Sequence, residues 1–396
     1  MTTSNKRTFY QYLALHSLLI GIFPFYIPVY LWKQNFGIGD ISFFIAFAGV
    51  GFTACLWIWD HLRKSVSLSS MIGLSLALEV ALLVNVYVLE MNQLILLILG
   101  FTYGAYNCFY WTTLRALFFD LVDEGSSGRK YGNFQIFVGA SLQIGIIIGG
   151  VLLEKTGFIT LLLVSTALAL AGYFFITHNK PPYPVSLAQN DSLKLPAILR
   201  FSDNYHSRLI FIIDGLFLFA ESFFWLITLF IIAHESFATL GVMILSLAVI
   251  FGILFFLLKN AIDRLGKRRV YILAVFSYAA SWALRAMTDT DLSLELLYAS
   301  LVMVAFCTAF FRLALNKRFY DLAKLTLSHD YLVLKSYYTQ IIVAILFGLL
   351  GVYSYWHESS ESLLVVIYWC SAVLALLYLL YGSHGQKTAN PELTPK

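Results

Sequence analysis

Six ionisable side chains lie inside long apolar stretches of this 396-residue chain: His16, Glu79, Arg115, Asp214, Glu221 and Arg312. An ionisable group near the centre of a bilayer costs about 2.5–3.5 kcal/mol on insertion scales, so it needs a partner, water or a function. Arginine is a forked donor suited to carboxylates and phosphates. Carboxyl and imidazole groups can carry protons. The residue types therefore predict a site that binds an ion or moves a proton.

Polar and aromatic residues recur at helical spacing around most of these groups. The sets are Tyr12 and His16; Asn107, Trp111 and Arg115; Asp214, Glu221, Trp225 and Thr228; and Thr308, Arg312 and Asn316. From them we assign substrate binding to Arg115, Arg312, Asn107, Trp111, Trp225 and Asn316. Two arginines suggest an anionic substrate, and internal pairing with Glu221, Asp214 or Asp321 is the alternative.

Proton coupling is the second chemistry that the buried groups predict. Glu221 is the first candidate, because a carboxyl group inside the bilayer can take up and release a proton. Asp214 and His16 follow it, and Glu79 is either structural or a further proton site. The four cysteines all lie in apolar runs without a C-x-x-C pair, so no disulfide framework, metal site or cofactor is expected.

Composition indicates which kind of protein must position these groups. Charged residues make up 12% of the chain and hydrophobic residues 60%, with a mean hydropathy of +0.78. Soluble proteins carry about 25% charged residues. A water-soluble or disordered chain is therefore excluded. A net charge of only +4, thinly spread, argues against nucleic acid as a partner. The expected partners are the lipid bilayer and a small-molecule substrate, and the expected oligomeric state is a monomer.

Apolar runs of about 20 residues predict an all-α polytopic membrane protein with twelve transmembrane helices. The expected spans are 8–32, 40–59, 68–89, 93–120, 132–153, 158–177, 208–233, 239–258, 270–288, 294–316, 333–356 and 362–381. The runs are too long, and do not alternate, for a transmembrane β-barrel.

Lysine and arginine positions predict the orientation. With the N-terminus inside, all but three of the 26 basic residues lie on the inner side, the exceptions being Lys33, Lys155 and Arg285. Both termini are then cytoplasmic and the protein sits in the cytoplasmic (inner) membrane. Residues 178–207 hold four of the eight prolines and predict a cytoplasmic linker. It separates two six-helix bundles, 1–177 and 208–382, and a tail follows at 383–396.

The two halves of the chain resemble each other at a nearly constant offset. Asp60 and Asp263 both follow a predicted helix, Phe119-Asp120-Leu121 matches Tyr320-Asp321-Leu322, and Gly150 matches Gly351, each about 200 positions apart. Duplicated halves of this kind build a central site at the repeat interface in many transporters.

Two short motifs resemble the major facilitator superfamily. Asp263, Arg264, Gly266, Lys267 and Arg268 match its cytoplasmic loop motif D-R-x-G-R-R, and Asp60, Arg63 and Lys64 form a reduced first copy with His61 in place of the arginine. Gly132, Gly145, Gly149 and Gly150 fit the glycine-rich pattern of many exporters of that family, from which Ser141 and Ile146 depart. The resemblance implies two six-helix bundles in which the first, fourth, seventh and tenth helices line a central cavity.

The roles of the loop charges and the glycines can be argued from physical chemistry, without the family resemblance. Carboxylates and basic groups at helix ends, with Asp120 and Asp321 on neighbouring helices, can latch one conformation of a gate. The alternative is plain positive-inside charge. Small residues let a helix approach its neighbour closely.

Three functions follow from these predictions. The leading one is proton-coupled secondary active transport of a small organic anion by alternating access, the anion being for example a polycarboxylate or a carboxylate-type siderophore. The alternatives are proton-driven efflux of lipophilic or cationic drugs, and a transporter-like receptor or assembly factor without transport. No Walker motif is present and no clustered nucleophile is found, so an enzyme is not expected.

Overall fold

The computed structural model describes residues 3–88, 92–121, 127–179, 192–264, 267–288, 292–325, 329–356 and 362–382. Within these ranges the chain is all-helical, as the sequence predicts. Eleven helices are long and apolar enough to cross a membrane, and Phe237–Ile250 is a shorter apolar stretch of a twelfth. The sequence could locate these helices because each stretch is both long enough and strongly apolar.

The first six predicted spans correspond to α1 (Thr3–Ile22), η1 (Pro24–Tyr26) and α2 (Ile27–Lys33); α3 (Ile38–Leu62); α4 (Leu68–Val88); α5 (Gln93–Asn107), η2 (Cys108–Thr112) and α6 (Thr113–Leu121); α7 (Ser127–Lys155); and α8 (Phe158–Asn179). The last six correspond to α11 (Ser207–Phe219), η3 (Ala220–Phe224) and α12 (Trp225–Ile232); α13 (Phe237–Arg264); α14 (Lys267–Met287); α15 (Leu294–Leu325); α16 (His329–Trp356); and α17 (Ser362–Ala375) with η4 (Leu376–Leu380). Between the two groups lies a short helix, α10 (Leu195–Arg200).

Four of the predicted helices are built from several pieces; the last of them is α17 followed by the 3₁₀ turn η4. The first is interrupted at Phe23 and resumes as a 3₁₀ turn with Pro24 near its start. Proline lacks an N–H and its ring crowds the preceding turn, so the continuous helix predicted over 8–32 is broken there. The fourth and seventh contain π-helical turns, η2 and η3. Such turns occur frequently at functional sites.

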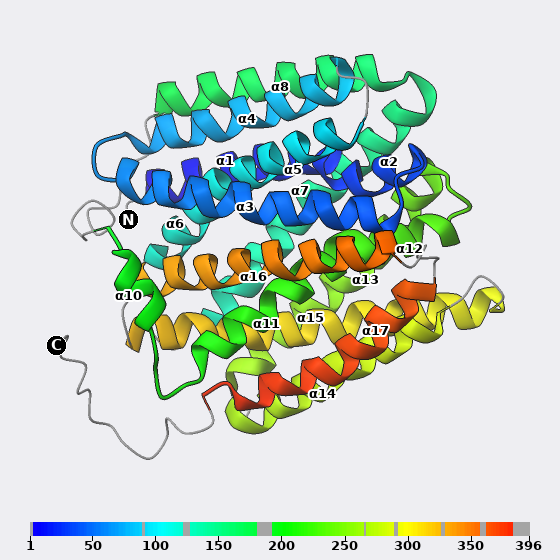
Figure 1. Cartoon of the computed structure of the whole chain (residues 1–396). Helices are drawn as coiled ribbons and strands as arrows, with labels where there is room; N and C mark the ends of the chain where they lie inside the picture. The colour runs from blue at the N-terminus through cyan, green and yellow to red at the C-terminus, as the bar shows by residue number, and fades with distance from the viewer. Residues whose placement is uncertain are drawn as a thin grey trace.

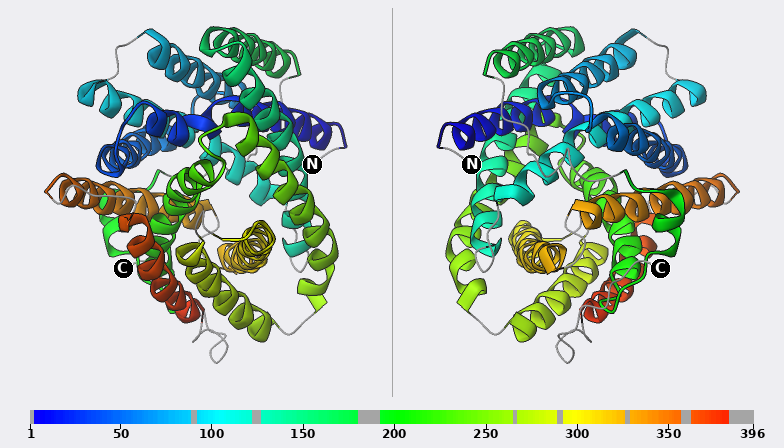
Figure 2. Two further views of the ribbon diagram at one scale, coloured as in Figure 1. Left: turned by 90° about the vertical axis from the view of Figure 1, so that its right-hand side faces the viewer. Right: turned by 90° about the vertical axis from the view of Figure 1, so that its left-hand side faces the viewer.

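The long helices run side by side, with α10, the start of α1 and the end of η4 at the same end of the molecule (Figure 1). Seen along the helices, α1–α8 form one group and α11–η4 the other (Figure 2). Two long contacts join the groups, α3 along α16 and α7 along α13. We call the end that carries α10 the linker end.

Glycines set the spacing between α1 and α7. A Cβ added at Gly145 or Gly149 would collide with the backbone carbonyl groups of Leu18 or Ile22, and one added at Gly21 would collide with Leu142. The two helices therefore pack backbone against backbone, as helices with small residues at the contact do. The surroundings of Gly132 are outside the part of the chain that the structure describes. This close packing fixes α1 against the wall of the central cavity.

Candidate functional site

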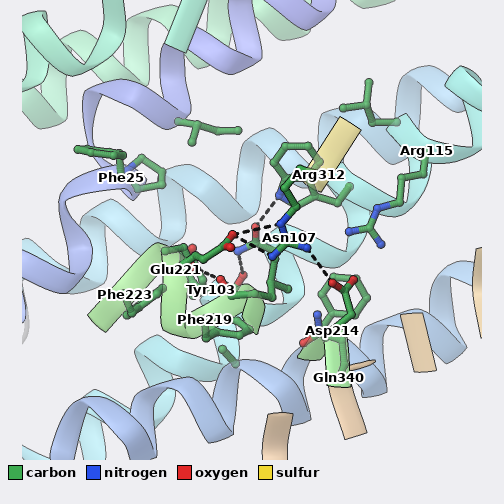
Figure 3. Close-up of a pocket in the computed structure, with 18 of the residues that line it drawn as sticks. Phe25, Tyr103, Asn107, Arg115, Asp214, Phe219, Glu221, Phe223, Arg312 and Gln340 are labelled. Carbon is green, nitrogen blue, oxygen red and sulfur yellow. Dashed lines mark hydrogen bonds and ion pairs between the residues drawn. The ribbon is translucent and has the colours of Figure 1, made fainter. Parts of the chain in front are cut away.

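A cavity of about 580 Å³ lies between the two groups of helices. Its wall is apolar and aromatic on one side and charged on the other (Figure 3). Phe25, Tyr103, Trp111, Phe219, Phe223 and Trp225 supply the aromatic rings. Arg115, Asp214, Glu221, Arg312 and Lys335 supply the charges, with Asn107, Asn316 and Gln340 as uncharged polar groups. All six residues that the sequence assigns to substrate binding line this cavity.

Arg312 is the centre of an ion-pair network in the cavity wall. Its Nη1 atom lies 2.7 Å from Asp214 Oδ1, and its Nη2 atom lies 2.8 Å from Glu221 Oε2. The Nε atom of Arg312 also donates to Glu221 Oε2 at 3.2 Å. The guanidinium group therefore bridges two carboxylates of the seventh predicted span, as Figure 3 shows. Arg312 is therefore paired with carboxylates of the protein itself, which is the alternative that the sequence left open.

Both carboxylates have further partners. Lys335 Nζ lies 2.9 Å from Asp214 Oδ2, and the Tyr378 hydroxyl donates to Asp214 Oδ1 at 3.0 Å. The Tyr278 hydroxyl donates to Glu221 Oε1 at 2.5 Å. Each carboxylate oxygen of Asp214 and Glu221 thus accepts at least one charged or neutral hydrogen bond. Arg312 and Lys335 thus supply charge-assisted hydrogen bonds to the two acids, and the two tyrosines supply neutral ones.

Arg115 is the cationic group of the cavity without a carboxylate beside it. It lies on α6, and its Nη1 atom donates to the hydroxyl of Ser336 on α16 at 3.2 Å. No ion pair joins Arg115 to a described carboxylate, in contrast to Arg312 and Lys335. Arg115 therefore contributes a positive charge that the protein itself leaves uncompensated within the described cavity wall.

Arg285, in the last turn of α14, lies behind the cavity wall. It is buried, its guanidinium group sits over the Trp282 and Trp225 rings at 4.3 and 5.2 Å, and it donates to Ser281 and Thr308 at 2.9 Å each. The sequence placed Arg285 merely near the outer end of its helix. Stacking on two indole rings lets this cation remain buried beside Trp225, which lines the cavity.

His16 and Glu79 are not among the described residues that line the cavity. The expectation that His16 and Tyr12 face it is wrong, because the helix face that carries them packs against α4 and α5 instead. His16 Nε2 lies 3.8 Å from Glu79 Oε2 and 3.2 Å from the Tyr106 hydroxyl, and the imidazole ring stacks on Tyr110 at 3.7 Å between centroids. Glu79 lies in the same buried cluster rather than toward lipid.

The first copy of the loop motif forms a buried pair at the linker end. Arg63 Nε donates to Asp60 Oδ1 at 2.7 Å. The backbone N–H of Leu193 donates to Asp60 Oδ2 at 2.8 Å, and the Ser192 hydroxyl donates to the Asp60 carbonyl oxygen at 3.1 Å. In addition, the Tyr338 hydroxyl donates to the Ile198 carbonyl oxygen on α10. The chain around α10 therefore ties α3 to α16.

Other residues of the loop motif are only partly described. Asp321 pairs with Lys317 at 3.5 Å, one turn earlier on α15. Lys64 and Arg268 are exposed at the linker end. The side chains of Asp120, Asp263, Arg264 and Lys267, and the whole of Gly266, lie outside the described residues. The gate assigned to the motif remains a prediction.

The two groups of helices touch at both ends of the cavity. Toward the linker end, the Phe118 and Tyr320 rings meet at 5.1 Å between centroids. Toward the opposite end, Glu154 on α7 accepts a hydrogen bond of 2.8 Å from the backbone N–H of Ala238 on α13. The Tyr26 and Phe237 rings also meet there, at 5.7 Å. These contacts join the two groups of helices at both ends of the cavity.

Sequence reasoning missed three partners of the charged network: Lys335, Tyr278 and Tyr378. A signal existed for Lys335, which falls two residues inside the predicted span 333–356. The tyrosines gave none, because a tyrosine in an apolar run usually belongs to the packing. Nor did the sequence link His16 with Glu79, which come from different helices 63 positions apart along the chain.

Twelve apolar helices around a central charged cavity define a polytopic membrane transporter. Residues 12–326 match the profile of the Major Facilitator Superfamily, and the chain belongs to that family. It is therefore a transporter rather than an enzyme.

Solved structures support the fold. The D323A mutant of the nucleoside transporter NupG is similar with a TM-score of 0.70 at 13% identity, covering 95% of this chain and 99% of that one. A bacterial homologue of the iron transporter ferroportin, in its outward-facing state, is similar with a TM-score of 0.65 at 13% identity, covering 95% of this chain and 98% of that one. No curated protein matches the chain.

Proposed function

We propose that this transporter carries a small organic anion by alternating access, coupled to protons. The observation that carries the proposal is the charge of the cavity. Its described wall holds Arg115, Arg312 and Lys335 against two carboxylates, and Arg285 adds a fourth cation behind Trp225. Asp214 and Glu221 engage Arg312 and Lys335, so Arg115 remains for an anion. A guanidinium fork suits a carboxylate.

The aromatic side of the cavity supports an organic rather than an inorganic anion. Phe25, Phe223 and Trp225 line the cavity together with the charged groups, and Trp111 lies one turn before Arg115. Rings of this kind bury the carbon skeleton of a ligand while a few polar groups orient it. Polycarboxylates, including carboxylate-type siderophores, combine an anionic group with such a skeleton.

The orientation is part of the same proposal. The linker end carries α10, the start of α1, the end of η4 and the Asp60–Arg63 pair, and the sequence predicts most of its lysines and arginines on that side. The positive-inside rule then puts this end in the cytoplasm and the protein in the inner membrane. Bundles 1–177 and 208–382 would rock about the cavity, with 178–207 as the connection between them.

The test is uptake into proteoliposomes that contain the purified protein. The probes are radiolabelled lactate, succinate and citrate, with tetraphenylphosphonium as a lipophilic cation, each with and without a pH gradient. We expect saturable, gradient-dependent uptake of one of the anions. Transport of the cation alone would replace the anion proposal by cation efflux, and binding without transport of any probe would favour a receptor.

Variants of Arg115 test the binding site directly. Losing one charge-assisted contact costs about 1.5–3 kcal/mol, or roughly 10- to 150-fold in affinity. Arg115→Gln should weaken binding of the transported anion by that factor, and Arg115→Lys should rescue it poorly because lysine lacks the planar fork. Exposed Arg200→Gln on α10 is the matched control. Full affinity in both Arg115 variants would contradict the assignment.

A further inference from the structure

The helices of the N-terminal group carry few ionisable groups in their apolar stretches. Residues 8–32, 41–59, 68–88, 93–119, 133–153 and 158–177 contain one histidine, one carboxylic acid and one basic residue, which is Arg115 of the cavity. The histidine is His16 on α1 and the acid is Glu79 on α4. They meet, with His16 Nε2 and Glu79 Oε2 3.8 Å apart. Each of these two groups alone would be costly to bury in the membrane. Their contact inside one bundle therefore indicates a specific site.

The site is closed to solvent. His16 is 0% exposed and Glu79 1% exposed. The Tyr12 hydroxyl lies 3.4 Å from His16 Nδ1, the imidazole ring stacks on Tyr110 at 3.7 Å, and the Tyr106 ring lies nearly parallel beside it at 5.7 Å between centroids. Among the described residues, these tyrosines are the only other titratable groups around the pair. His16 lies in 8–32 and Glu79 in 68–88. The neighbouring α7 and α8 contribute no charged group at this depth.

Glu79 lacks the partners that an ionised carboxylate needs. Neither of its oxygens has a hydrogen-bond partner among the described residues. A carboxylate buried without hydrogen bonds or a cation costs several kcal/mol. Only a proton within the pair removes that cost, and because 3.8 Å between His16 Nε2 and Glu79 Oε2 is too long for a hydrogen bond, the proton belongs on the Glu79 carboxyl group. The packing around the pair therefore requires one bound proton.

The acids of the cavity are placed differently. Asp214 and Glu221 are held by Arg312 and Lys335, whose permanent charges already balance them. A proton added there would compete with an ion pair. The sequence made Glu221 the first candidate for coupling, yet its contacts suit a structural and binding role better. The pair in the N-terminal group has no such competitor.

Tyr106 connects the pair with the cavity by a hydrogen bond. Tyr106 lines the cavity, and its hydroxyl lies 3.2 Å from His16 Nε2. The next residue, Asn107, also lines the cavity, and the π-helical turn η2 begins directly after it. A change of charge on the pair would thus be felt at the cavity wall through one hydrogen bond. The same hydroxyl offers a route for a proton.

We infer that the His16–Glu79 pair binds the proton that drives transport, with Tyr106 as its link to the substrate cavity. The inference rests on the proposed function. One proton enters the pair from one side of the membrane, is held while the helices are packed as here, and leaves to the other side after they rearrange. Because this packing needs the proton, proton binding favours this conformation over one in which water reaches Glu79.

Infrared spectroscopy tests the site without any substrate. Purified protein is titrated with acid and base, and the carbonyl stretch of protonated carboxylic acids is followed in H₂O and D₂O. We expect a band at neutral pH that disappears in Glu79→Gln. It should persist in Glu221→Gln and in exposed Glu295→Gln, and shift in frequency in Tyr106→Phe. Persistence of the band in folded Glu79→Gln, or its absence from the unaltered protein, would overturn the inference.

Transport separates failure of this inference from failure of the proposed function. With labelled lactate, succinate and citrate, Glu79→Gln should abolish accumulation above equal concentrations, while exchange across a membrane without a gradient survives. Gradient-driven accumulation that is intact in Glu79→Gln would overturn the inference and leave the anion proposal standing. If the unaltered protein moves none of the anions, the proposed function fails, and the infrared band still decides whether the pair binds a proton.

Discussion

Replacing Arg312 by glutamine should damage one of its two carboxylate partners far more than the other. Arg312 contacts Glu221 through two nitrogens and Asp214 through one. Without the guanidinium group, Asp214 keeps Lys335 at 2.9 Å, whereas Glu221 keeps only the hydroxyl of Tyr278. The variant therefore leaves Glu221 as a carboxylate with no cation in contact, and leaves Asp214 paired.

The size of the effect follows from burial. Removing one partner of a buried ion pair costs about 3–5 kcal/mol. The side chains of Arg312 and Glu221 are 20% and 18% exposed, so water from the cavity reaches part of the pair. We therefore expect Arg312→Gln to lower the free energy of unfolding by about 3 kcal/mol, the lower end of that range.

A double-mutant cycle identifies which carboxylate is responsible. Glu221→Gln added to Arg312→Gln should recover about 1–3 kcal/mol, because the double variant contains no unpaired charge at that position. Asp214→Asn added to Arg312→Gln should recover nothing, since it leaves Lys335 without its partner. The assay is equilibrium unfolding by sodium dodecyl sulfate in mixed micelles. Additive losses for Arg312→Gln and Glu221→Gln, or recovery by Asp214→Asn instead, would refute this reading of the network.

Three further predictions concern packing, the linker end and topology. Gly149→Val should lower the unfolding free energy by about 1–3 kcal/mol or more by forcing α1 and α7 apart. Gly139→Val should not lower it, because open space surrounds Gly139. Equal effects of the two substitutions would contradict the close packing. Asp60→Asn should destabilise the protein by about 1.5–3 kcal/mol through loss of its charge beside Arg63, measured by the same unfolding assay, and an unchanged value would leave the pair without a stabilising role. Reporter fusions at Lys396 and within 180–205 should both report cytoplasm, and an external signal at either would end the proposed orientation.

The helices could be predicted from the sequence because each is a long apolar run, and hydropathy does not depend on tertiary contacts. The π-helical turns could not. Cys108–Thr112 is as apolar as its surroundings, and although Ala220–Phe224 contains Glu221 and Ser222, neither composition marks an added residue in a turn. The break at Pro24 did have a signal, since proline interrupts a helix by its covalent structure.

Contacts within one helix face were easier to predict than contacts between helices. Asp214 and Glu221 share a face by spacing, and both bind Arg312. The His16–Glu79 contact depends on how α1 and α4 are rotated against each other, which is set by packing and not by either helix alone. The direction in which His16 points was wrong for the same reason.

The internal repeat explains why the two arginines of the cavity have different roles. At the offset that relates Phe119-Asp120-Leu121 to Tyr320-Asp321-Leu322, Arg312 corresponds to Trp111, and Arg115 corresponds to Asn316. The arginines are therefore one helical turn apart with respect to the repeat, and not equivalent. Arg312 lies level with Asp214 and Glu221 and is balanced by them. Arg115 lies one turn nearer the linker end, beside Ser336 and without a carboxylate among the described residues. An anion drawn to the unbalanced charge would then bind toward the linker end, with its apolar part against Trp111.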